Sequence, residues 1–344
     1  RIDLATRQQV QEVETGLHPS DLIWDARREQ ILVANANSDT VTVLSRQLEV
    51  LATISVRPDD DLPFGSASNA LALSSDHKRL FVANAGNNAI AVLENDTDAA
   101  RDWRLRGFFP TAWYPAALAQ HDDHIFIANT KGYGSRSDAA ADRRSVYSFT
   151  GVVTAVENPT DEQLSEFTQQ VISNTHLPAM LSALERKAVT ATIPPAPVPQ
   201  VLGARSVFEH VVYVIKENRT YDQVFGDLSQ GNGDERLCIY PRAVTPNHHA
   251  LVEQYVLLDN YYCNGVNSAD GHSWSTEGNV TDDLEQSFAG FTRSYTCGHD
   301  PLTDCSSGCL WDNVLAHGLT YRNDAEMDNA TPIPEYETFS QIWQ

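Results

Sequence analysis

Residues 209–228 read EHVVYVIKENRTYDQVFGDL, and this stretch decides the interpretation of the second part of the chain. Residues 211–215 are a continuous run of Val, Tyr and Ile, which is typical of a strand buried on both faces of an α/β sheet. Glu217 and Asn218 follow at the carboxyl end of this strand, where open α/β sheets bind their ligands. Their carboxylate and amide oxygens suit a divalent cation. The sequence therefore predicts a central strand that ends at a metal site, and the alternative is the start of a solvated loop.

A second polar turn follows a second apolar run. Residues 255–263 read YVLLDNYYC and predict another buried strand, fed by a preceding helix. Residues 265–275 read GVNSADGHSWS and place Ser268 in a glycine-containing turn after that strand. A small hydroxyl residue in such a turn is exposed, so a nucleophile is expected within this turn.

The first of these stretches resembles a known family. The string ENRTYDQVFG, residues 217–226, resembles the opening motif of the phosphoesterase family that includes bacterial phospholipases C and related acid phosphatases. This family belongs to the alkaline phosphatase superfamily, so the resemblance implies an α/β domain of that type. It also implies that Glu217 and Asn218 hold metal.

The second stretch resembles the same family less completely. The DNYYC run, residues 259–263, is similar to the strand that leads to the family's Gly-Pro-Thr nucleophile turn, and Ser268 falls on the Thr. The family's following Pro-Asn-Arg is replaced by Asp-Gly-His at residues 270–272, a form similar to that of members fused to a propeller. The nucleophile therefore stays open, with Ser275 and Thr276 as alternatives to Ser268.

The resemblance implies a mechanism. A phosphate ester is attacked in line, and two divalent cations about 4 Å apart stabilise the attacking and leaving oxygens. In this interpretation Ser268 binds one cation and attacks as the alkoxide, while Glu217 and Asn218 hold that cation. Asp270 and His272 contact the substrate, and His272 is also assigned to catalysis. Metal binding and a structural role are the alternatives for His272. The cofactor is expected to be Zn, Mg, Ca or Mn.

The first part of the chain contains a repeat. Three segments share a template of strand, polar turn and strand, and their Ala-Asn pairs end at Asn35, Asn84 and Asn129, a period of about 45 to 49 residues that is typical of propeller blades. The units resemble YVTN-type β-propeller repeats. The sequence thus predicts an incomplete all-β propeller of about three blades over residues 1–155. These Asn residues are interpreted as turn formers without a chemical role.

A glycine-rich segment, residues 130–137, interrupts the third unit. Its TKGYGSRS sequence lacks the Gly-Lys-Ser/Thr ending of a phosphate-binding P-loop, so we interpret it as an excursion of the chain. A similar Lys-Gly segment occurs in proteins that fuse such a propeller to the phosphoesterase, where the blade meets the catalytic domain. We therefore expect Lys131 at the interface of the two domains.

A connector, residues 156–204, separates the blades from the phosphoesterase domain at residues 205–344. Its first part has a helical apolar stripe after the capping residue Thr160, and a second helix is predicted from Pro178 to Ala188. Residues 191–200 are rich in proline and form a stiff spacer. The predicted architecture is therefore multidomain, with propeller blades followed by the N-terminal part of an α/β alkaline phosphatase-like domain.

The composition limits the partners. The formal charge of −22 repels nucleic acid and anionic membranes, and no apolar run reaches the length of a transmembrane helix. The chain begins at Arg1 without Met and ends at Gln344 before the superfamily's later Asp and His ligands, so we expect a truncated and largely inactive fragment. We expect the intact protein to be secreted or periplasmic, its signal peptide missing from this segment.

The five cysteines allow three interpretations. Cys297, Cys305 and Cys309 lie close together with His299, which permits a zinc knot over residues 296–309. Disulfides in surface loops of an exported protein are the favoured interpretation, and free thiols come next.

The predicted function is a metal-dependent phosphoric ester hydrolase. A sulfatase is disfavoured because residues 238–242, CIYPR, have the wrong spacing for its nucleophile motif. A phosphate-transfer mutase shares the metals and the nucleophile and stays open. The alternative from another class is a propeller that binds a protein or glycan, with an inactive phosphoesterase domain as scaffold. The substrate stays open among monoester, diester and phospholipid.

Overall fold

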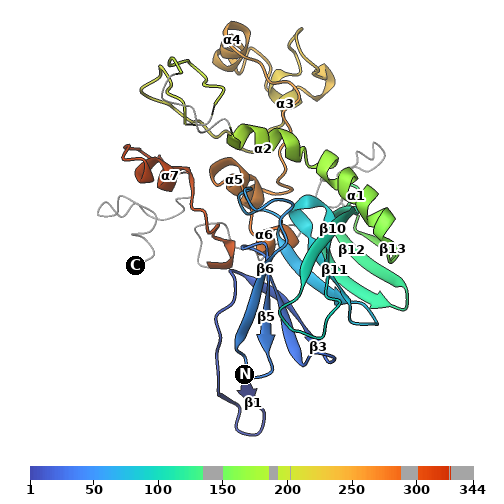
Figure 1. Cartoon of the computed structure of the whole chain (residues 1–344). Helices are drawn as coiled ribbons and strands as arrows, with labels where there is room; N and C mark the ends of the chain where they lie inside the picture. Colours follow the sequence, from blue (N-terminus) through green and yellow to red (C-terminus); the bar gives the residue numbers. More distant parts are fainter. Residues whose placement is uncertain (135–149, 186–192, 202, 288–300, 325, 327–344) are drawn as a thin grey trace.

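The computed structural model describes residues 1–134, 150–185, 193–201, 203–287, 301–324 and 326. The first part consists of three antiparallel sheets, shown from blue to green in Figure 1. Within each sheet the strands are neighbours in chain order, which is the arrangement of a propeller blade. A small hairpin precedes them, formed by β1 (Ile2–Asp3) and β2 (Gln8–Gln9).

The three sheets confirm the blades that the repeat predicts. The first contains β3 (Pro19–Asp25), β4 (Gln30–Asn35), β5 (Thr40–Ser45) and β6 (Val50–Ser55). The second contains β7 (Ser68–Leu73), β8 (Arg79–Asn84), β9 (Ala89–Glu94) and β10 (Arg104–Pro110), with the short 3-10 helix η1 (Ala85–Asn87) between β8 and β9. The third contains β11 (Trp113–His121), β12 (His124–Gly132) and β13 (Val152–Glu157).

The core lies between the blades. The central strands of the first two sheets are apolar on both faces, so each packs against a neighbouring sheet on either side. Leu80 and Val82 of β8 point into one buried cluster, which they share with the first blade. Phe81 points into a second cluster, which it shares with the third blade, and its ring meets Phe109 edge to face at 6.3 Å.

The repeat is also visible in the backbone conformation. A residue in the left-handed conformation stands at the start of each sheet: His18 (φ 55°), Ala67 (φ 51°) and Tyr114 (φ 55°). None is a glycine, although this conformation costs an L-residue roughly 1–2 kcal/mol. The three units therefore share an unfavourable backbone angle as well as a strand order.

Two helices form the connector, as the sequence predicts. They are α1 (Asp161–Asn174) and α2 (Leu177–Glu185). Thr160 and Gln163 cap the start of α1 reciprocally through side chain and backbone. Leu164 and Val171 on its apolar face are buried against the blades. The hydroxyl of Thr168 accepts the backbone N–H of Phe108 at 2.9 Å, which fixes α1 on β10.

In the part of the chain that follows, the regular elements among the described residues are short helices joined by irregular segments. This part contains α3 (Tyr221–Phe225), α4 (Pro246–Gln254), α5 (Ser268–Thr276), α6 (Asp282–Gln286) and α7 (Leu310–Ala316). Two short 3-10 helices accompany them, η4 (Glu235–Leu237) and η5 (Pro301–Thr303). None of the described helices is both long and apolar enough to span a membrane.

Two strand predictions are wrong. Residues 211–215 and 255–263 form no strand, and the side chains of Val211 and Val212 are 84% and 87% exposed. A continuous apolar run becomes a central strand only when neighbouring strands pair with both of its edges. No strand lies among the described residues after Glu157, so these runs have nothing to pair with.

Candidate active site

Ser268 is the first residue of α5, and the turn that leads to it is held by Asp270. The carboxylate of Asp270 is 1% exposed and accepts the backbone N–H of Val266 at 2.7 Å and of Asn267 at 3.1 Å. A buried carboxylate that accepts two backbone N–H groups has its oxygens committed. Asp270 therefore positions the start of α5, and its contact with substrate stays a prediction.

Glu217 lies beside this helix although 51 residues separate it from Ser268. The hydroxyl of Ser268 donates a hydrogen bond to Glu217 Oε1. His272 is one helical turn further along α5, so it shares a face with Ser268. Its Nε2 lies 3.5 Å from Glu217 Oε2. The structure thus brings together three of the residues singled out from the sequence, and Glu217 contacts both of the others.

Glu326 completes the cluster and was missed in the sequence. Its Oε1 lies 2.6 Å from His272 Nδ1, so His272 stands between two carboxylates. No motif surrounds Glu326, and 54 residues separate it from His272. No signal in the sequence alone could have identified it, because only the fold joins these segments.

Asn218 differs from Glu217 in its contacts with the cluster. Its backbone is in the left-handed conformation with φ 67°, and its carbonyl oxygen accepts a hydrogen bond from the guanidinium of Arg219. No hydrogen bond links its side chain to Ser268 or His272 in the described part of the chain.

The alternative nucleophiles are engaged within α5. Ser275 donates its hydroxyl to the carbonyl oxygen of Gly271 at 2.7 Å, and Thr276 donates to that of His272 at 2.8 Å. Neither hydroxyl meets a carboxylate in these contacts, whereas Ser268 does. The geometry therefore favours Ser268 over both alternatives.

His249 has a structural role. It is fully buried in α4, with Nε2 2.8 Å from Asp227 Oδ1 and Nδ1 2.8 Å from the carbonyl oxygen of Thr245. The backbone N–H of Arg242 and the imidazole of His249 hold the pKa of the Asp227 carboxyl below its usual range. Both ring nitrogens of His249 are therefore used in fixing the start of α4.

The donor chemistry of the cluster can be compared with the metal that the family implies. Glu217 and Ser268 place two oxygen donors side by side, as hard divalent cations require. Among the described residues, however, no three His, Cys, Asp or Glu side chains are arranged to hold a metal ion. Glu217 and Ser268 therefore fit only part of the coordination shell of a divalent cation, and Glu217 would be its carboxylate ligand.

The predicted zinc knot can be followed only in part. Cys297 and His299 lie outside the described residues. Cys305 is a free thiol, and burial raises the pKa of this thiol. Cys238 and Cys263 are also free, so no disulfide joins the four described cysteines.

A buried polar contact joins the blades to α6. Asp282 Oδ1 accepts hydrogen bonds from Asn69 Nδ2 at 2.7 Å and from the Tyr114 hydroxyl at 2.8 Å. Burial, together with the carboxylates of Asp282 and Glu285, raises the pKa of the Tyr114 phenol well above its usual range. Tyr114 therefore stays protonated and acts as the donor to Asp282.

Lys131 lies at the same interface, as the sequence predicts. Its ammonium group forms an ion pair with Glu285 of α6 and lies 5.5 Å from the centroid of the Tyr114 ring. Both charged side chains are buried. Burial raises the pKa of the Glu285 carboxyl, and the charge of Lys131 acts in the opposite direction.

Comparison with solved structures returns propellers and other proteins at low similarity. The β-propeller domain of Cps50 (Swd1) from Myceliophteria thermophila is 10% identical, with 46% of this chain and 45% of that chain covered and a TM-score of 0.30. Hydrazine synthase from Kuenenia stuttgartiensis is 17% identical, with 36% and 32% covered and a TM-score of 0.28. Streptogramin B lyase is 17% identical, with 41% of each chain covered and a TM-score of 0.28. The chain spans less than half of each structure.

The family comparison falls on the helical part of the chain. The model of the Phosphoesterase family matches residues 208–300, which include Glu217, Ser268 and His272. No curated protein matches the sequence. The blade assignment follows from the strand order of the three sheets. The chain therefore joins β-propeller blades to a segment that matches the Phosphoesterase family model.

Proposed function

We propose that this chain belongs to a phosphoric ester hydrolase in which Ser268 is the nucleophile. The observation that supports this most is the hydrogen bond from the Ser268 hydroxyl to Glu217, within the segment that matches the Phosphoesterase family. A serine hydroxyl is a weak nucleophile until a neighbouring base or a cation activates it. Glu217 is the base in contact with it.

The reaction follows from these contacts. Glu217 accepts the proton of Ser268 Oγ as that oxygen forms a bond to phosphorus, and the bond from phosphorus to the leaving oxygen breaks. His272 lies within reach of the same place and donates a hydrogen bond to a phosphoryl oxygen. Glu326 holds His272 through Nδ1, so the Nε2 edge of the ring stays directed at the site. Water then releases phosphate from the serine.

A divalent cation would be held by Glu217 and Ser268, with Asn218 assigned by the family resemblance. When bound, it would neutralise negative charge that builds up on the phosphoryl oxygens. Asp270 would keep Ser268 at the correct place through its two backbone contacts. The proposed substrate is a phosphate ester. Whether it is a monoester, a diester or a phospholipid distinguishes phosphatase from phospholipase C activity.

The test compares matched variants of the full-length gene product that contains these residues. We expect Ser268→Ala to lower the hydrolysis of p-nitrophenyl phosphate and bis(p-nitrophenyl) phosphate more than about 10³-fold, since removal of a nucleophile removes the covalent route. Glu217→Gln should lower turnover and also the bound metal measured by elemental analysis. The relative rates on the two substrates indicate monoester or diester specificity.

Ser275→Ala is the control, because Ser275 lies in the same helix and is bound to a carbonyl oxygen. It should keep wild-type turnover. Undiminished turnover in Ser268→Ala would overturn the assignment of the nucleophile. A wild-type protein with neither metal nor turnover would instead favour a binding scaffold with an inactive phosphoesterase domain.

A further inference from the structure

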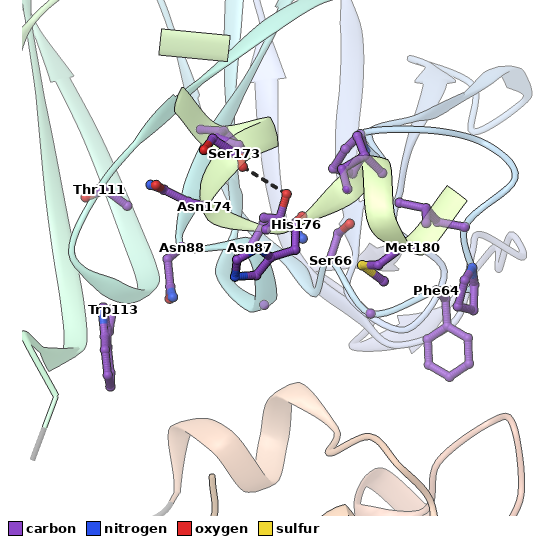
Figure 2. A pocket seen from close by; sticks show the side chains of 18 residues that line it. Phe64, Ser66, Asn87, Asn88, Thr111, Trp113, Ser173, Asn174, His176 and Met180 are labelled. Carbon is purple, nitrogen blue, oxygen red and sulfur yellow. Dashed lines mark hydrogen bonds between the residues drawn. The ribbon is translucent and has the colours of Figure 1, made fainter. Parts of the chain in front are cut away.

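A cavity of about 760 Å³ lies between the blades and the connector helices (Figure 2). Its wall is formed by the loop between β6 and β7, the turn at η1, the start of β11 and the junction of α1 with α2. Its volume falls within the range of about 300–1,000 Å³ that is usual for small-molecule sites. None of its lining residues belongs to the cluster around Glu217, so a ligand here would be bound apart from the proposed reaction.

The lining carries no permanent charge. None of the 18 residues that line the cavity is Asp, Glu, Lys or Arg, and His176 is the titratable residue among them. The chain as a whole has 46 acidic residues and a formal charge of −22. A site for a phosphate ester or another ion needs a charged partner or a set of dipoles directed at the ion. The lining therefore fits a neutral ligand.

Amide side chains provide polar contacts. Asn88 Oδ1 accepts the backbone N–H of Tyr114 at 2.9 Å, and Asn174 Oδ1 accepts a hydrogen bond from Gln170 at 2.7 Å. Each contact fixes an amide and leaves its NH₂ group as a donor. Thr111 donates its hydroxyl to Asn129 at 3.1 Å, so its oxygen can still accept. The cavity thus offers donors and acceptors in fixed positions, as hydroxyl groups require.

Trp113 adds an aromatic surface. Its side chain is 50% exposed, and Figure 2 shows it at the side of the cavity where Asn88 and Thr111 also lie. The backbone of Gly134 is packed against the indole so closely that an added Cβ would lie 2.5 Å from a ring carbon. Gly134 therefore lies against one side of the ring, while half of the Trp113 surface is exposed.

We propose that this cavity binds a neutral carbohydrate. The apolar C–H face of a sugar ring packs on the indole of Trp113, and its hydroxyl groups exchange hydrogen bonds with Asn88, Asn174 and Thr111. An aromatic surface beside a few fixed polar groups is the general composition of a site that orients a small ligand. The absence of charge among the lining residues excludes sugar phosphates and uronic acids as the preferred class.

The test measures binding of three neutral disaccharides to the 344-residue chain: cellobiose, maltose and N,N′-diacetylchitobiose. We expect at least one to bind saturably in isothermal titration calorimetry and to change the tryptophan fluorescence. Trp113→Ala should weaken that binding by about tenfold or more, as truncation of a central aromatic contact does. Asn174→Ala should weaken the binding of the disaccharide as well. Glucuronic acid should bind less tightly than glucose, its neutral counterpart.

Trp24→Ala is the matched control, because Trp24 of β3 is 46% exposed and lies outside the cavity. It should leave the affinity unchanged, and circular dichroism should show both variants folded. The proposal is overturned if none of the three disaccharides binds at millimolar concentration. It is also overturned if Trp113→Ala binds the disaccharide as tightly as the wild type and the Trp24→Ala control do. Neither result depends on hydrolase activity.

Discussion

Asp25 at the end of β3 shows how single residues hold the blades together. Its side chain is fully buried and contacts Arg28 at 3.0 Å, Gln30 at 2.9 Å and His77 of the next blade at 2.8 Å. Burial alone would raise the pKa of the Asp25 carboxyl, but the hydrogen bonds from Arg28, His77 and Gln30 lower it below 3.8. The ionised carboxylate is therefore the form that stabilises the fold.

Asp25→Asn is expected to destabilise the chain by about 3–5 kcal/mol at pH 7, because the buried Arg28 loses its carboxylate partner and keeps only neutral carbonyl acceptors. The pKa of Asp25 is lower in the folded state, so its contribution is present above 3.8 and is lost as the pH falls through the folded value. Urea unfolding at several pH values should show the variant and the wild type converging in acid. Asp98→Asn, which removes an exposed pair with Arg27, should change little at any pH. A constant gap between Asp25→Asn and the wild type would contradict this account.

The candidate site was predictable only where a motif marked it. Glu217, Ser268 and His272 stand in strings that suggest their chemistry, and the structure brings them together. Asp270 has a side chain that could bind substrate, but its hydrogen bonds from the backbone N–H groups of Val266 and Asn267 are visible only in the structure. Glu326 has no motif, since its place next to His272 depends on how distant segments pack. The catalytic roles of Glu217, Ser268 and His272 remain predictions.

At the scale of elements, α1 is held on the blades by the absence of a side chain. Gly107 of β10 lies directly under the helix, where an added Cβ would be 2.4 Å from Thr168 Oγ1 and 3.2 Å from Leu164 Cγ. Thr168 also hydrogen-bonds the backbone N–H of Phe108 at 2.9 Å. The helix can therefore make this bond only if position 107 has no Cβ.

Gly107→Ala should lower the free energy of unfolding by about 1–3 kcal/mol, because the methyl group forces Thr168 and α1 away from β10. Thermal or urea unfolding measures the loss, and hydrogen exchange should show α1 less protected. The control is Ser165→Ala, an exposed position on the same helix, which should change stability by less than about 0.5 kcal/mol. Equal stability of Gly107→Ala and the wild type would show that α1 can shift without loss.

The elements of the first part were predictable because their signal is repeated. Each blade presents alternating or fully apolar strands between polar turns, and Asn35, Asn84 and Asn129 mark the period. The runs at 211–215 and 255–263 have equally strong local signals, yet they lie exposed and unpaired. Strand formation there depends on partners from elsewhere in the fold, which a local pattern does not contain.

At the scale of the whole molecule, three buried contacts to two carboxylates of α6 join the blades to the segment that matches the Phosphoesterase family. Lys131 of β12 pairs with Glu285, while Asn69 and Tyr114 donate to Asp282. Helix α5, which carries Ser268 and His272, packs against α6 through Ala269 and Leu284. The interface is therefore only a short distance along the chain from the candidate active site.

Lys131→Met is expected to destabilise this interface by about 3–5 kcal/mol at neutral pH, because Glu285 is left as a buried charge without a partner. The pKa of Glu285 is raised in the folded state, so the loss should be small below 4.5 and grow as the pH rises through the folded value. Hydrogen exchange of α5 and α6 and urea unfolding measure the effect. Lys216→Met, at an exposed lysine, is the control, and the double variant Lys131→Met/Glu285→Met should recover much of the loss. No recovery would contradict the assigned pairing.

The left-handed position shared by His18, Ala67 and Tyr114 has a consequence for how the units can differ. The three units have nearly the same backbone angle there, while the side chain is an imidazole, a methyl group or a phenol. Because the strain belongs to the backbone, exchanging one such side chain for another adds little to it. The position therefore accepts side chains of different chemistry at little cost in stability. In the third unit it carries the phenol that donates to Asp282, so this blade contacts α6 without an added loop.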